Sequence, residues 1–220
     1  MKRLTGARAK ALLKPLTRLV CTRELRAAGG PQVLLTFDDG PHAETTPAVL
    51  RLLSRYRARG IFFVVGSRII QAPALLREIL AEGHGIGNHS FTHYLHRPPG
   101  LVEYYRDVVR AQAEIERACG ARPRLFRPPL GELRVSGLAA ARLLGLRTVL
   151  WSVDSGDWRM RQASDVRPTL EAVLRRLDGR PLHDIVLLHD EKPETVALLE
   201  PLLETLQARG VDLYGGVERL

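Results

Sequence analysis

The chain has 220 residues, 45% of them hydrophobic, and a formal net charge of +9. A chain of this length buries one sizeable core but is short for two, so we expect a single domain. Eight basic residues against one acidic residue, Glu24, lie between Met1 and Gly30, which leaves only +2 for the other 190 residues. A domain so nearly balanced carries no electrostatic signature for DNA or RNA, and we expect no nucleic-acid partner.

Residues 1–30 are interpreted as a basic N-terminal tail or helix, and residues 31–220 as the folded domain. The tail has apolar residues at helical spacing between its cationic positions, namely Leu12, Leu16, Leu19 and Val20. This pattern suits a short helix on an anionic membrane surface, although Pro15 weakens it. We favour the alternative of a helix packed under the domain or a solvated arm, and keep peripheral membrane contact open.

The same segment shows no clear export signal or membrane span. Lys14, Pro15 and Arg18 interrupt the one candidate apolar core, and no stretch approaches the ~20 apolar residues that a spanning helix needs. We therefore expect a cytoplasmic protein or one peripheral at the membrane surface, with export left open. Cys21 and Cys119 allow at most one disulfide and leave the redox compartment undetermined.

From Gln32 onward, short apolar runs alternate with longer stretches of helical periodicity. The expected strands are 33–37, 61–65, 85–87, 124–126, 147–151, 184–188 and 211–214, and the expected helices are 47–57, 73–81, 102–118, 137–144, 164–177 and 195–207. Alternating strands and helices predict parallel pairing, in a doubly wound sheet or a barrel. About seven units are few for an eightfold barrel of ~250 residues. The predicted fold class is α/β, an irregular or trimmed (β/α) barrel of about seven βα units in one domain.

Polar residues follow five of the predicted strands, at the end where such barrels carry their catalytic groups. The five groups are Asp38-Asp39, Asn88 to His93, Arg127 to Gly131, Asp154 to Trp158 and His189-Asp190. Because the carboxyl ends of parallel strands meet at one edge of the sheet, we expect these groups to converge on one mouth.

His89 and His93 are four residues apart, so on one helical turn both imidazoles can hold the same cation. With Asp39 as a third ligand, they would form the set that leaves an open position at a catalytic zinc ion. We expect one divalent metal ion, zinc first, with Co²⁺, Mn²⁺ or Ni²⁺ as alternatives.

The second aspartate, Asp38, has a separate role in this interpretation. A divalent ion lowers the pKa of a water that it binds, but hydrolysis still needs a base to accept the proton, and Asp38 can serve. Arg127 would hold Asp38 through a charge-assisted contact. The backbone N–H of Leu130 could then face the developing oxyanion.

The leaving group must gain a proton, and His189 suits that role if a carboxylate such as Asp154 keeps it protonated. Trp158 follows a loop of small and acidic residues, so it is as well suited to the wall of a sugar-binding groove as to the core. Leu187 lies two positions before His189 and should face the same side of the strand, as an apolar floor for a small acyl group.

These residues together resemble the polysaccharide deacetylases of carbohydrate esterase family 4. The five motifs of that family are matched in order by Thr36-Phe37-Asp38-Asp39-Gly40, His89 to His93, Arg127-Pro128-Pro129-Leu130-Gly131, Asp154 to Trp158 and Leu187-Leu188-His189. The resemblance implies metal-dependent hydrolysis of an N-acetyl, or less often O-acetyl, group on a glycan. It implies that Asp38 is the base, that Asp39, His89 and His93 are the ligands, and that His189 is the acid. Arg127 would orient Asp38, and for the aspartate beside His189 we choose Asp154 over Asp157.

One residue departs from the family pattern, because Leu130 stands where an aromatic side chain is common. Catalysis should survive, since the oxyanion contact would come from the backbone. The substrate expected is an acetylated glycan such as peptidoglycan, a chitin-like oligomer or a surface polysaccharide. The alternatives are a hydrolase of another C–N bond, such as a cyclic amide, and a non-catalytic metal-containing glycan-binding module. The oligomeric state is not predicted.

Overall fold

The computed structural model describes residues 21–25, 29–93, 99–179 and 182–220. They form one sheet of eight strands in the order β1-β6-β5-β4-β3-β2-β8-β7. The strands are β1 (Cys21–Thr22), β2 (Gln32–Asp38), β3 (Gly60–Val64), β4 (Gly85–Asn88), β5 (Leu125–Phe126), β6 (Arg147–Val149), β7 (Val153–Asp154) and β8 (His183–His189). All seven neighbouring pairs are parallel. The sheet curls into a half-barrel that is open between β1 and β7, which confirms the predicted trimmed (β/α) barrel.

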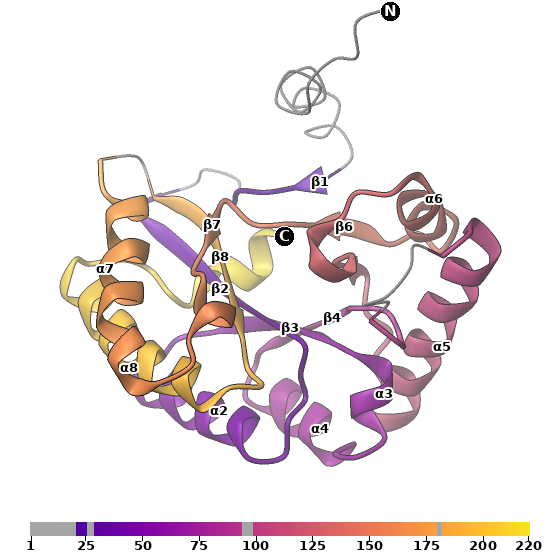
Figure 1. The fold of residues 1–220 in the computed structure, drawn as a ribbon, viewed down its shortest axis with the longest axis horizontal. Helices are drawn as coiled ribbons and strands as arrows, with labels where there is room; N and C mark the ends of the chain where they lie inside the picture. The colour runs from indigo at the N-terminus through magenta and orange to yellow at the C-terminus, as the bar shows by residue number, and fades with distance from the viewer. Residues whose placement is uncertain (1–20, 26–28, 94–98, 180–181) are drawn as a thin grey trace, which may run out of the picture.

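The helices cover the outer side of the curled sheet. They are α2 (Thr45–Arg55), α3 (Gly66–Ile69), α4 (Ala74–Ala81), α5 (Leu101–Cys119), α6 (Val135–Leu143), α7 (Val166–Leu177) and α8 (Pro193–Ala208). Figure 1 shows them in an arc that runs from α7 and α8 through α2, α4 and α3 to α5 and α6. Because these seven helices lie on the outer side, the inner side of the half-barrel remains open to the C-terminal segment and, at the strand ends, to the site.

Side chains of the central strands alternate between the two sides of the sheet, as the period of two requires. On β2, Val33, Leu35 and Phe37 belong to the large core beneath the helices. Leu34 instead joins a smaller inner cluster with Ile61, Phe63 and Ile185, which Val217 and Leu220 of the C-terminal segment also contact. The C-terminal segment therefore fills part of the half-barrel, while the next inward residues on β2 toward the strand end, Thr36 and Asp38, are polar.

The folded domain begins earlier than predicted. Cys21 and Thr22, which we had assigned to the tail, form β1 and pair with β6. Leu25 is buried in the inner cluster, and its N–H donates to the His183 carbonyl at 2.9 Å. A two-residue strand is too short to give a periodic signal, so the sequence did not reveal it. The remainder of the predicted tail, residues 1–20, lies outside the described residues.

The predicted strand at 211–214 does not form. Asp212 makes only an isolated bridge to Gln32, and its Oδ1 accepts hydrogen bonds from the N–H groups of Tyr214 and Gly215. This local turn ends the extended run. The predicted strand 147–151 is also shorter, since β6 ends at Val149 and β7 follows separately.

Two further expectations concern the cysteines and the membrane. Cys21 and Cys119 are both free thiols. None of the helices in the described ranges combines the length and the apolar character needed to cross a bilayer.

Candidate active site

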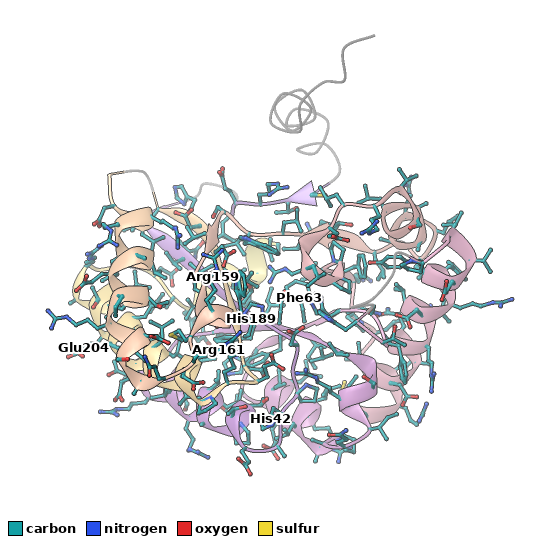
Figure 2. All side chains as sticks on the ribbon, in the orientation of Figure 1. His42, Phe63, Arg159, Arg161, His189 and Glu204 are labelled. Carbon is teal, nitrogen blue, oxygen red and sulfur yellow. The ribbon has the colours of Figure 1, made fainter. Side chains whose placement is uncertain are left out.

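The predicted site residues meet at the carboxyl ends of the strands. Asp38 ends β2, His189 ends β8, and the two residues lie opposite each other in the register of these strands. The loops after β4 and β5 carry His89 and Arg127 to the same place, where His89 Nε2 lies 3.6 Å from Asp38 Oδ2. Figure 2 shows His189 near the centre of the molecule in this view.

Asp39, His89 and His93 form a group that could hold a metal ion, with one ligand atom from each residue and all three atoms within 4.8 Å of one another. Asp39 Oδ1 lies 3.0 Å from His93 Nε2 and 3.5 Å from His89 Nε2. The same oxygen is buried and accepts no hydrogen bond within the part of the chain that the structure describes. A cation among these three atoms would satisfy that oxygen, so the residues fit the predicted ion.

The protonation states of this group also suit a cation. His89 Nδ1 lies 2.7 Å from the Arg127 carbonyl, which can only accept, so Nδ1 carries the proton and the Nε2 lone pair faces Asp39. Burial lowers the pKa of His89, which favours its neutral form. Burial raises the pKa of Asp39, but the contacts with His93 and His89 outweigh this effect and hold the pKa well below its ordinary value. A neutral imidazole and an ionised carboxylate are the forms that bind metal.

The loop that carries the two histidines is held by buried polar side chains. The Asn88 amide donates to Gln112 Oε1 at 2.9 Å and its oxygen accepts from the Ser90 N–H at 2.8 Å. Asp107 of α5 accepts from the N–H groups of Phe91 and Thr92. The sequence analysis missed Asp107, because a carboxylate within an amphipathic helix gives no signal that it faces inward.

Arg127 is fully buried and holds Asp38. Its Nη1 donates to Asp38 Oδ1 at 2.6 Å and to Thr36 Oγ1 at 2.9 Å. Its Nε and Nη2 donate to the carbonyls of Val149 and Leu150, and the guanidinium stacks 4.1 Å from the ring centroid of Phe63. The predicted contact between Arg127 and Asp38 is present, and the other bonds fix the guanidinium in one orientation.

Asp157, not Asp154, is the carboxylate beside His189, so our choice between them was wrong. Asp157 Oδ1 lies 2.7 Å from His189 Nδ1, and its Oδ2 accepts from the His189 N–H and from Thr195 Oγ1. Asp154 Oδ1 instead accepts from the Gly156 N–H. The left-handed conformation of Gly156, with φ of 77°, reverses the chain between the two aspartates, which turns Asp157 inward.

The pair with Asp157 keeps His189 protonated near neutral pH. Burial lowers the pKa of His189, but the hydrogen bond and the charge of Asp157 outweigh it and, with the charges of Asp38 and Asp39, raise the pKa to about 9. With Nδ1–H donated to Asp157, Nε2 is left free to carry the second proton.

The three predicted substrate-binding residues differ in exposure. The Leu130 side chain is 60% exposed, and its backbone has φ of 59°, in the left-handed region. Trp158 is 43% exposed, which suits a groove wall better than a core position. Leu187 is buried on the inner side of β8, the side that His189 also faces.

Two further contacts at the mouth were not expected from the sequence. Arg68 donates to the Asp39 carbonyl at 2.6 Å, which fixes the backbone of a candidate ligand. Asp190 lies fully buried behind the Asp39-Gly40 turn, where its Oδ2 accepts from Thr46 Oγ1 at 2.5 Å. Burial raises the pKa of Asp190 to about 7. Neither contact follows from a motif, because the partners are far apart in sequence.

The chain is similar in sequence and in structure to known proteins. A family model described as polysaccharide deacetylase matches residues 26–149. A peptidoglycan-N-acetylglucosamine deacetylase of Listeria monocytogenes is 35% identical over 196 residues, which are 86% of this chain but only 40% of that protein. A chitooligosaccharide deacetylase of Bradyrhizobium is 35% identical over 207 residues, covering 85% of this chain and 90% of that protein. The family 4 carbohydrate esterase from Streptomyces lividans in complex with acetate has a TM-score of 0.73 at 31% identity, covering 84% of this chain and 92% of that chain.

Proposed function

The chain belongs to the polysaccharide deacetylase family, and from this premise we propose that it is a metal-dependent hydrolase that removes N-acetyl groups from a glycan. The observation that carries the proposal is the convergence of Asp39, His89 and His93 within 4.8 Å. The Asp38–Arg127 and His189–Asp157 pairs lie on the strand ends around it. The site thus offers a place for a cation, a carboxylate held by a fixed cation, and a protonated histidine.

The three ligand residues would hold one divalent ion. Zinc is our first choice, with Co²⁺, Mn²⁺ or Ni²⁺ as alternatives, because two imidazoles and a carboxylate suit several first-row metals. When bound, the ion would act as a Lewis acid that polarises the acetyl carbonyl.

The protein's own groups would carry the protons. Asp38 would accept a proton from the attacking water, and Arg127 would keep its carboxylate oriented. His189 would donate a proton from Nε2 to the leaving amine, and Asp157 would position the ring. The Leu130 N–H would stabilise the negative charge that develops on the carbonyl oxygen.

The substrate would lie along the exposed face of the mouth. Trp158 would form one wall of a sugar-binding groove, and Leu187 would form an apolar floor for the acetyl methyl group. The two relatives described above are a peptidoglycan deacetylase and a chitooligosaccharide deacetylase, so these two glycan classes are the candidate substrates. The chain spans less than half the length of the Listeria protein, so its substrate has to be tested directly.

Acetate release from a panel of N-acetylated and O-acetylated oligosaccharides tests the proposal. The protein is treated with a chelator and then supplied with Zn²⁺, Co²⁺, Mn²⁺ or Ni²⁺, with the full-length Asp38→Asn variant as the control. We expect the wild type alone to recover release, since the variant keeps the ligands but loses the base. A metal-loaded wild type that binds glycan and releases no acetate would instead support the non-catalytic glycan-binding module. Release from a cyclic amide alone would support the other hydrolase.

The N-terminal segment is proposed as a separate element. We keep residues 1–20 as a basic tail with possible peripheral contact to an anionic membrane, and residues 21–220 as the deacetylase domain. Sedimentation with anionic and neutral vesicles, with and without residues 1–20, measures that contact. If the proteins with and without residues 1–20 sediment equally with anionic vesicles, the proposed membrane contact is refuted.

A further inference from the structure

Two cationic side chains at the mouth share the same pair of carbonyl oxygens. Lys192 Nζ donates to the Trp158 carbonyl at 2.7 Å and to the Met160 carbonyl at 3.3 Å. Arg161 Nη1 donates to the same two oxygens at 3.1 and 3.4 Å. Because both nitrogens bond the same oxygens, the ammonium and guanidinium groups lie side by side, and like charges this close repel.

The same loop carries a third cation, Arg159, whose guanidinium carbon lies 4.5 Å from the ring centroid of Trp158. We call Arg159, Arg161 and Lys192 the cationic cluster. Among the described residues, no carboxylate forms an ion pair with any of its three head groups. The nearby Asp165 carboxylate is engaged by the backbone N–H groups of Arg161 and Gln162, at 2.8 and 3.2 Å.

Arg68 lies at the same mouth but, unlike the cationic cluster, forms an ion pair with a carboxylate. Its Nη1 lies 2.6 Å from Glu191 Oε2. Among the described residues, the hydrogen-bond and ring partners of the cationic cluster are carbonyl dipoles and an aromatic ring, and the one carboxylate charge that acts on it, Asp165 near Arg161, forms no ion pair with it. The charge of the cluster is therefore available to a ligand, and an anion placed there would relieve the repulsion between Lys192 and Arg161.

The cluster lies next to the catalytic groups. Asp157, which contacts His189, is followed directly by Trp158 and Arg159 in the loop after β7. Lys192 follows His189 by three residues in the loop after β8. In the view of Figure 2, Arg159 is labelled above His189 and Arg161 below it. An anion on the cluster would thus belong to a molecule whose other part reaches the candidate metal site.

We propose that the cationic cluster is a subsite for an anionic group, a carboxylate or a phosphate, carried by the glycan whose N-acetyl sugar lies at His189. This inference rests on the proposed function and narrows it to anionic glycans over neutral chitin-like oligomers. Trp158 would stack on the sugar while the cluster binds the acid group, as arginine and lysine do with carboxylates and phosphates.

Equilibrium binding tests the subsite without turnover. The full-length, zinc-loaded Asp38→Asn protein is titrated calorimetrically with three ligands of equal length: a neutral N-acetylglucosamine oligomer, the alternating oligomer in which every second sugar carries a lactyl carboxylate, and a neutral oligomer bearing one phosphate. We expect at least one anionic ligand to bind about tenfold more tightly than the neutral one, the size expected of two exposed charge contacts. The stronger of the two anionic ligands identifies the source of the charge.

A charge-matched pair of variants gives the control. Adding Arg161→Gln and Lys192→Gln should reduce the affinity of the anionic and neutral ligands to within about twofold of each other, because the two contacts are lost. Adding Arg51→Gln and Arg142→Gln, which remove two exposed charges from α2 and α6, should leave the preference intact. High salt, at about 0.5 M, should weaken only the anionic ligands.

Equal binding of anionic and neutral ligands by the parent protein overturns the subsite, and so does a preference that survives loss of Arg161 and Lys192. Acetate release by the wild type from the neutral oligomer is measured separately. Release without an anion preference would sustain the proposed function and refute the subsite. Anion-selective binding without release of acetate from any ligand would sustain the subsite and refute the proposed function.

Discussion

Replacing Asp157 with Asn tests whether His189 is the proton donor and Asp157 the group that keeps it charged. Asp157 Oδ2 accepts from the His189 N–H and Thr195 Oγ1, so the amide oxygen of Asn should take that position. The amide nitrogen then faces His189 Nδ1, where it can donate but not accept. The imidazole would become neutral, with its proton on Nε2. The site would keep its shape, while the pKa of His189 would change.

The magnitude follows from the pKa of His189, which the wild-type contacts raise to about 9. Without Asp157 the pKa should fall to the ordinary value of about 6.5 or below, since burial lowers it. At about pH 8 the protonated fraction would fall from roughly nine tenths to about 3%, and the rate by about 30-fold. At about pH 6 the loss should be much smaller than at about pH 8, and less than about twofold for a pKa of about 6.5, because most of the imidazole is then protonated in both proteins.

The sign of the pH effect is fixed by the role of His189. A general acid works only when protonated, so activity disappears as the pH rises through its pKa, and a lower pKa moves this alkaline limb to lower pH. A cation at Asp39 would offset the smaller contributions of Asp38 and Asp39 in both proteins. The contribution of Asp157, and therefore the direction of the change, would remain.

The assay is kcat for acetate release from pH 5.5 to 10 at saturating zinc, for the wild type, Asp157→Asn and Asp154→Asn. Asp154→Asn is the matched control. Among the described residues, the Asp154 side chain hydrogen-bonds only to the Gly156 N–H. We expect Asp154→Asn to keep the wild-type profile. An alkaline limb that stays in place in Asp157→Asn, or moves in Asp154→Asn, would refute the assignment.

Three other substitutions test the ligands, the turn behind them and the core. His89→Ala should abolish stoichiometric zinc binding in equilibrium dialysis, and unchanged stoichiometry would remove His89 as a ligand. Gly40→Ala should destabilise the fold by about 1–3 kcal/mol, because a Cβ there would lie 2.4 Å from both carboxylate oxygens of buried Asp190; an unchanged urea midpoint would contradict this. Leu202→Ala, at a fully buried position of α8, should lower the free energy of unfolding by about 2–5 kcal/mol, whereas exposed Leu143→Ala should change it by less than about 0.5 kcal/mol.

The arrangement of the site could be predicted because parallel strands bring their carboxyl ends to one edge. Asp38, His89, Arg127 and His189 all follow predicted strands, and the structure places them together. That prediction did not need correct strand ends. An error of one or two residues in a predicted strand boundary still leaves the residue at the carboxyl edge of the sheet. The same tolerance explains why the barrel was predicted although the 211–214 strand was not formed.

The contacts within loops could not be predicted in the same way. Asp154 and Asp157 are both acidic, both follow β6, and differ only in which one the turn at Gly156 directs inward. The partner that fixes Asp157, Thr195, lies 38 residues away in sequence. Such a choice depends on tertiary hydrogen bonds, which leave no periodic signal in the chain.

Backbone conformation points to the same residues as the chemistry does. Within the described ranges, five non-glycine residues have positive φ, and four of them, Asp39, Ser90, His93 and Leu130, lie in the candidate site. Each such conformation costs of the order of 1–3 kcal/mol and persists only where neighbouring contacts fix it. Here the Arg68 bond to the Asp39 carbonyl and the Ser90 bond to the His93 N–H supply such contacts. Contacts within the protein therefore help to fix the geometry of the candidate site, as a polarising cation and an oxyanion donor require.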